Sequence, residues 1–130
     1  MITAFYIAIF ILIQIALASY VIFGRWRYGV SLGDGGHKDL RNRIRTYGNF
    51  TEIIPFTLLL LYVAETHHAL EASWTHVFAQ ILLLGRILHI IGLRQKRSTN
   101  RWRQVGMIFT FISMFSVSIM VLFTLATKIF

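Results

Sequence analysis

Residues 1–24 read MITAFYIAIFILIQIALASYVIFG and contain no charged side chain. The hydrocarbon core of a bilayer is about 30 Å thick, so a helix that rises about 1.5 Å per residue needs roughly 20 apolar residues to cross it. We therefore predict a membrane-spanning helix over residues 3–23. A cleaved signal peptide is the rival interpretation, because residues 16–18 (ALA) resemble a cleavage site. Signal peptides carry positive charge before the apolar run, however, and here Arg25 and Arg27 follow it.

The rest of the chain has the same apolar character. Of its 130 residues, 56% are hydrophobic and 14% are charged, which is too few charges for the surface of a soluble domain. Three further apolar stretches predict spans over residues 46–66, 74–93 and 104–127. We therefore expect a single all-α domain over residues 1–130, folded as an integral membrane four-helix bundle. The chain contains no cysteine, so any thiol chemistry needs a thiol from another molecule.

Most basic residues lie in two of the predicted loops. Residues 25–45 hold six and residues 94–103 hold five, so 11 of the 13 lysines and arginines are in these segments. They are Arg25, Arg27, Lys38, Arg41, Arg43 and Arg45 in the first segment, and Arg94, Lys96, Arg97, Arg101 and Arg103 in the second. Cytoplasmic loops carry the excess of Lys and Arg. We therefore predict that both basic loops are cytoplasmic and both termini periplasmic. Topology then explains the net charge of +8, and no nucleic-acid partner is expected.

Two charged residues, Glu52 and Arg86, stand out well inside the predicted spans. A charge in the bilayer centre costs about 2.5 to 3.5 kcal/mol and usually faces the protein interior. Glu52 lies seven residues past Arg45 and Arg86 eight residues before Arg94, which places both roughly 10 to 12 Å from the same basic boundary. This equal depth admits a structural ion pair between the second and third helices. The second helix itself is expected to begin near Lys38.

Other polar residues accompany these two at helical spacing. The second helix carries a polar face about 100° wide, and two residues share a face of the third helix. These residues are Arg41, Arg45, Gly48, Asn49 and Glu52 on the second helix, and Arg86 and His89 on the third. Together with the basic ends of the other helices they predict a cationic pocket with one carboxylate. Guanidinium groups clamp carboxylates and a glutamate can hold an ammonium group, so the pocket suits glutathione or a lipid head group.

Four motifs carry a family resemblance. Residues 34–37 (DGGH), 45–55 (RTYGNFTEIIP), 85–89 (GRILH) and 101–107 (RWRQVGM) together resemble the MAPEG family, the membrane-associated proteins of eicosanoid and glutathione metabolism. The similarity spans nearly the whole chain and is greatest to the short bacterial inner-membrane members. It implies four helices per subunit and a homotrimer. It also implies three glutathione sites between neighbouring subunits, open to the cytoplasm.

The resemblance also implies roles for individual residues. Glutathione, as co-substrate, would be bound by Arg45, Asn49, Glu52, Arg86 and His89, with Arg25 or Arg27 added from the foot of the first helix. Either Arg101 or Arg103, at the start of the fourth helix, would stabilise the thiolate. A guanidinium beside sulfur favours the charged form and so lowers the pKa of the thiol. The implied activity is a glutathione-dependent membrane transferase or peroxidase that acts on a lipophilic electrophile or hydroperoxide.

The chain departs from the family pattern at two positions. Several eicosanoid members carry tyrosines where this chain has Ile53 and Leu93, which removes two hydroxyl donors. This departure favours the alternative of a non-catalytic protein that binds a lipid or anion and regulates a partner. A small exporter is a third possibility, but such proteins place a carboxylate in the first span, where this chain has the neutral Gln14.

A metal site is not expected. Three histidines cluster near the predicted external loop, at His67, His68 and His76. They have no carboxylate at a ligand spacing, and a histidine cluster alone is weak evidence for a metal.

Overall fold

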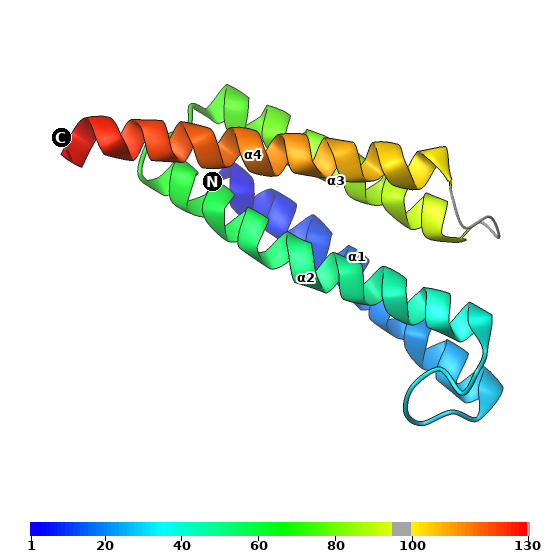
Figure 1. The fold of residues 1–130 in the computed structure, drawn as a ribbon. Coiled ribbons are helices and arrows are strands. Elements are labelled where there is room, and N and C mark those ends of the chain that lie inside the picture. Colours follow the sequence, from blue (N-terminus) through cyan, green and yellow to red (C-terminus); the bar gives the residue numbers. More distant parts are fainter. Residues whose placement is uncertain (95–99, 130) are drawn as a thin grey trace.

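Four helices make up the fold in the computed structural model, which describes residues 1–94 and 100–129 (Figure 1). They are α1 (Ile2–Tyr28), α2 (Lys38–Thr66), α3 (Ala72–Arg94) and α4 (Arg101–Ile129). No strand occurs within these described ranges. Each helix is long and apolar enough to cross a membrane. The all-α bundle of four spans is thus confirmed. α2 begins at Lys38 as expected, about two turns before the span predicted over residues 46–66.

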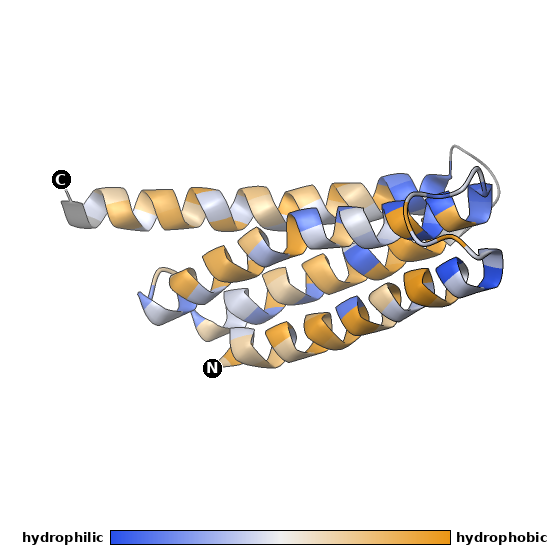
Figure 2. Ribbon diagram, turned by 90° about the horizontal axis from the view of Figure 1, so that it is seen from below, coloured by the Kyte–Doolittle hydropathy of each residue, from blue (hydrophilic) through white to orange (hydrophobic). Residues whose placement is uncertain are grey.

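The helices run up and down, so the polar segments collect at one end of the bundle. Both chain termini lie at one end, and the connection from α1 to α2 lies at the other (Figure 1). Hydrophilic residues gather at this second end in the hydropathy-coloured view (Figure 2). The two basic segments therefore share one end, as the topology prediction requires. Lys96 and Arg97 of the second segment lie outside the described residues, and the orientation in the membrane remains a prediction.

Helices α3 and α4 form the tightest pair, and glycine makes this possible. A Cβ atom on Gly106 would lie 2.5 Å from the backbone nitrogen of His89, and one on Gly85 would lie 2.9 Å from the carbonyl oxygen of Gly106. A Cβ atom on Gly92 would collide with the backbone of Arg103. Small residues allow close approach of helices in membranes, where lipid removes most of the hydrophobic drive for association. The two helix backbones therefore lie in close contact between residues 85–92 of α3 and 103–110 of α4.

The end of the bundle that holds the termini is joined by polar contacts between helices. The Glu65 carboxylate, at the end of α2, accepts hydrogen bonds from the backbone N–H groups of Ile2 (2.6 Å) and Thr3 (2.8 Å). These are N–H groups of the first turn of α1, which have no partner within their own helix. The Tyr6 hydroxyl lies 3.2 Å from Nδ1 of His76, which links α1 to α3. The polar residues here hold helices together.

Candidate functional site

The centre of the candidate site is Arg86, whose side chain is 1% exposed. Its Nε and Nη2 atoms donate to Thr110 Oγ1 on α4, at 3.1 and 2.8 Å. Nη1 donates to Asn49 Oδ1 on α2 at 3.0 Å, and Nη2 also approaches Met107 Sδ at 3.4 Å. One guanidinium therefore joins three helices. All of these partners are neutral.

The ion pair between Glu52 and Arg86 does not form. Glu52 is exposed on α2, and its carboxylate has no salt-bridge or hydrogen-bond partner within the described ranges 1–94 and 100–129. The nearest heavy atom to a Cβ built on Gly48 is Glu52 Oε1, at 3.9 Å, so little covers this face of α2. Equal depth along the two helices does not produce contact, because Arg86 is buried against Thr110 and Asn49 while Glu52 is exposed.

The other predicted residues of α2 divide between its surface and its interior. Arg45 is exposed like Glu52, whereas Asn49 is half-buried and contacts Arg86. These three residues, Arg45, Asn49 and Glu52, occupy successive turns of one face, and we call them the α2 stripe. The stripe thus has two exposed charges at its ends and an amide, anchored to the buried guanidinium, between them.

His89, Arg101 and Arg103 complete the predicted set on α3 and α4. His89 is 3% exposed, and its backbone packs against Gly106. Arg101 and Arg103 are both exposed in the first turn of α4. The backbone of Arg103 is held against Gly92, so its position is fixed by the close α3–α4 contact. The structure does not bring either arginine into polar contact with Arg86.

The two arginines at the foot of α1 differ. Arg25 Nη1 donates to the carbonyl oxygens of Ser31 (3.0 Å) and Gly33 (3.1 Å), so Arg25 shapes the connection to α2. Arg27 is exposed, with its guanidinium carbon 5.7 Å from the centre of the Tyr28 ring. Of the two, Arg27 is the residue whose charged group is not engaged by backbone carbonyls.

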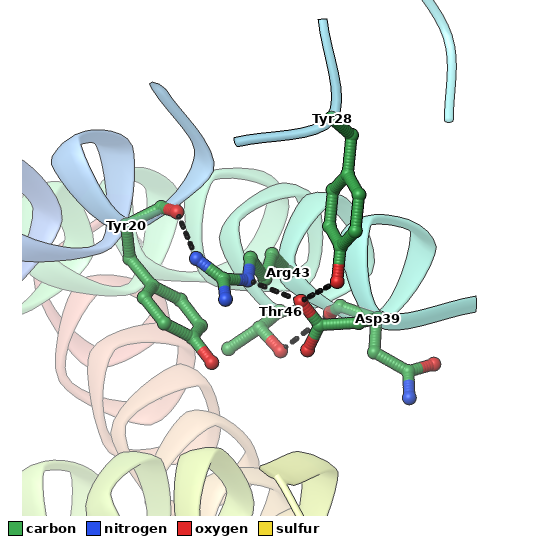
Figure 3. A network of polar contacts seen from close by, with 6 residues as sticks. Tyr20, Tyr28, Asp39, Arg43 and Thr46 are labelled. Carbon is green, nitrogen blue, oxygen red and sulfur yellow. Dashed lines mark hydrogen bonds and ion pairs between the residues drawn. The ribbon is translucent and has the colours of Figure 1, made fainter. Parts of the chain in front are cut away.

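Sequence reasoning gave Arg43 no role beyond topology, yet this residue joins α1 to α2 (Figure 3). Its Nη1 donates to the carbonyl oxygen of Tyr20 at 3.0 Å and its Nε to Asp39 Oδ2 at 2.9 Å. The guanidinium also lies 4.0 Å from the centre of the Tyr20 ring, and the Tyr28 hydroxyl donates to the same Asp39 carboxylate. The i, i+4 spacing of Asp39 and Arg43 was the available signal for this pair.

Hydrogen bonds to the Asp34 carboxylate order the connection between α1 and α2. The side chain of Arg41 donates to the Asp34 carboxylate, and the Gly36 backbone N–H donates to it at 2.9 Å. The Arg41 hydrogen bond first, and the Gly36 hydrogen bond second, hold the pKa of Asp34 below its usual value. The sequence placed Arg41 on the polar face of the second helix, but its side chain pairs with Asp34 in the loop.

An apolar pocket of about 380 Å³ lies between α1 and α2. It is lined by Ile7, Phe10, Ile11, Gln14, Ile54, Pro55, Leu58, Leu59 and Tyr62. No member of the α2 stripe lines it. Within the described part of the chain, no group of three or more His, Cys, Asp or Glu side chains is placed to hold a metal ion.

These features define an integral membrane four-helix bundle with a buried guanidinium behind an exposed polar stripe. Residues 3–123 match the model of the MAPEG family, and the chain belongs to this family. It is similar to the inner membrane protein YecN of Escherichia coli K12, with 33% identity over 114 residues, covering 88% of this chain and 85% of the relative. The YecN protein of E. coli strain CFT073 matches equally well. No solved structure gives a significant match.

Proposed function

We propose that the chain binds glutathione on the α2 stripe and uses its thiol against a lipophilic substrate in the membrane, in a site completed between copies of the chain in a homotrimer. The observation that carries this proposal is the exposure of Arg45 and Glu52 on one face of a membrane helix. Glu52 lies inside the span and Arg45 at its basic boundary, and a charge facing lipid near the bilayer centre costs about 2.5 to 3.5 kcal/mol. This face therefore needs a polar ligand, water or a second protein surface to cover it.

The side chains of the α2 stripe match the functional groups of glutathione. The Arg45 guanidinium suits one of its two carboxylates, the Glu52 carboxylate suits its ammonium group, and Asn49 adds an amide between them. Behind the stripe, Arg86 is a buried cation with only neutral partners among the described residues. A buried charge without a counter-charge favours an anion nearby. The net electrostatics of the stripe therefore favour an anionic peptide over a neutral one.

The proposed chemistry is nucleophilic attack by the sulfur of glutathione. The thiol of glutathione loses its proton to water or buffer, and a guanidinium at the start of α4 stabilises the thiolate. The sulfur then attacks an electrophilic carbon, a C–S bond forms, and a leaving group departs with its electron pair. With a hydroperoxide, two glutathione molecules instead become one disulfide while the peroxide is reduced to an alcohol and water. Arg101 and Arg103 are the candidates for the guanidinium.

The test is titration calorimetry of glutathione into the purified protein in detergent. We expect saturable binding that weakens about tenfold or more in Glu52→Gln, because a charge-assisted hydrogen bond contributes about 1.5 to 3 kcal/mol. Lys38→Ala is the matched control, since it removes a charge of the same helix outside the stripe and should bind normally. Absence of binding by the unaltered protein would contradict the proposal.

A non-catalytic role is the second candidate, and Ile53 and Leu93 favour it. Neither side chain can donate a hydrogen bond to a thiol-bearing peptide, whereas the resemblance implies tyrosines there in several eicosanoid members of the family. In this case the chain would bind a lipid or another anion and regulate a partner without turnover. Thermal stabilisation by an anionic lipid, with glutathione inert, is the expected signature. Turnover of any electrophile with glutathione would exclude this candidate.

A further inference from the structure

The buried contacts of Arg86 leave it no free face toward the α2 stripe. Its guanidinium donates from Nε and Nη2 to Thr110 and from Nη1 to Asn49, and the side chain is 1% exposed. A ligand on the surface of α2 therefore meets Asn49 before it meets Arg86. The role of Arg86 has to be exerted through its neighbours.

The Thr110 hydroxyl is fully used in holding Arg86. A hydroxyl has one hydrogen to donate and two lone pairs to accept. Thr110 Oγ1 donates its hydrogen to the carbonyl oxygen of Gly106 at 2.8 Å. It accepts hydrogen bonds from both Nε and Nη2 of Arg86. The residue is 0% exposed. The guanidinium plane is thereby fixed on two of its three nitrogens, and Nη1 is left to face α2.

This geometry sets the direction of the Asn49 amide. A guanidinium has only donors, so the atom of Asn49 that faces Arg86 is the oxygen, and the NH₂ group faces the other way. Nδ2 has no partner within the described residues. No buried side-chain nitrogen or oxygen among those residues lacks a partner, so Nδ2 must reach the molecular surface. Asn49 lies on the same face of α2 as Arg45 and Glu52, one turn from each.

We propose that Arg86 and Thr110 are positioning residues, which hold the Asn49 side chain so that its NH₂ group is a fixed donor to a carboxylate or carbonyl oxygen of the ligand. This inference rests on the proposed function in taking the α2 stripe as the binding face. It assigns Arg86 an indirect role and gives Thr110 of α4 a part in recognition. The orientation is built into the fold before any ligand arrives.

Asn49→Asp tests the donor directly. An aspartate keeps an oxygen toward Arg86 and gains a charge-assisted contact there, so the variant should fold and melt at or above the temperature of the unaltered protein. On the outer side it replaces the NH₂ donor with a second oxygen, which repels a carboxylate. We expect glutathione affinity in calorimetry to fall about tenfold or more. Unchanged affinity in a folded Asn49→Asp protein would overturn the proposal.

Thr110→Val and Thr110→Ser test the positioning role. Valine has nearly the shape of threonine but cannot accept from Arg86, whereas serine keeps the hydroxyl. We expect glutathione affinity to fall several-fold in Thr110→Val and to stay within about twofold in Thr110→Ser. A residue with a merely structural role would change the melting temperature of Thr110→Val but leave the affinity of its folded fraction unchanged, and that result would overturn the proposal.

A ligand-free measurement separates this inference from the proposed function. The chain has three asparagines, Asn42, Asn49 and Asn100, so protein labelled with ¹⁵N-asparagine gives three side-chain amide signals in NMR. The signal lost in Asn49→Asp identifies Asn49. We expect a water-soluble paramagnetic agent to broaden it, since the NH₂ group faces outward. If glutathione fails to bind, the proposed function is wrong but this orientation is still measured. A signal unaffected by the agent would overturn the orientation.

Discussion

The inner and outer faces of α2 differ in whether their polar side chains have partners. Toward α3 and α4, Arg86 donates hydrogen bonds to Asn49 and Thr110, and the Thr110 hydroxyl donates to the backbone of α4. Every buried polar side-chain atom of this set therefore has a partner. On the outer face, Arg45 and Glu52 are charged, exposed and without an ion pair within the described ranges. The interior is complete in one chain, whereas the outer face leaves two charges without an ion pair among the described residues.

Two glycines give the largest expected contrast between these regions. Gly106→Ala puts a Cβ atom 2.5 Å from the backbone of His89, so α3 and α4 must separate. We expect a loss of about 1 to 3 kcal/mol of stability, as for other overpacked cores. Gly48→Ala meets only Glu52 Oε1 at 3.9 Å, so it should be neutral or stabilise α2 by up to about 1 kcal/mol.

Thermal unfolding in detergent measures both glycine variants. If Gly48→Ala destabilises the isolated subunit as much as Gly106→Ala does, the contrast between a packed interior and an open outer face is wrong. Glutathione titration of Gly48→Ala adds a second reading. Loss of affinity without loss of stability would show that the ligand approaches the α2 backbone closely.

The guanidinium at the start of α4 gives the next largest effect. Replacing the arginine that faces the sulfur should raise the pKa of bound glutathione, so that less thiolate forms at neutral pH. Arg101→Ala and Arg103→Ala are compared by the ultraviolet absorbance of the thiolate across a pH series. We expect one variant to shift the titration to higher pH and the other to serve as its control. Identical titrations in both variants and in the unaltered protein would remove Arg101 and Arg103 from the mechanism.

The opposite end of the bundle should affect stability and not binding. Glu65→Gln weakens the two hydrogen bonds that the carboxylate accepts from the first turn of α1, and we expect a loss of about 1 kcal/mol. Glu71→Gln, an exposed acid in the connection that follows α2, is the matched control. Thermal unfolding measures the loss, and glutathione affinity should be unchanged in both. A change of affinity in Glu65→Gln would mean that the two ends of the bundle are coupled.

The smallest effect is expected in the loop between α1 and α2. The pKa of Asp34 is lowered in the folded protein, chiefly by Arg41, so its contribution to stability is present above the unfolded pKa and is lost as pH falls through the folded pKa. Asp34→Asn should therefore be slightly less stable at neutral pH, with the difference vanishing in acid. Melting temperatures across pH check this. A difference that grows toward low pH would have the wrong sign.

The sequence was enough to predict the four helices but not the direction in which each helix turns its side chains. Apolar runs of about 20 residues with few or no charges placed all four spans, and the spacing of Arg45, Asn49 and Glu52 placed them on one face. The direction in which Arg86 points depends on Thr110, which lies 24 residues further along the chain on another helix. Such a pairing has no local signal. It becomes possible where glycines bring α3 close to α4, and there Arg86 donates to Thr110 while Glu52 stays exposed.

The most direct test of the central claim is an experimental structure of the protein in lipid with glutathione present. We predict glutathione against Arg45, Asn49 and Glu52, with the Asn49 NH₂ group donating to it and Arg86 behind, out of contact with the ligand. Lipid tails or a closed apolar protein surface packed directly on Arg45 and Glu52, with glutathione elsewhere or unbound, would contradict it.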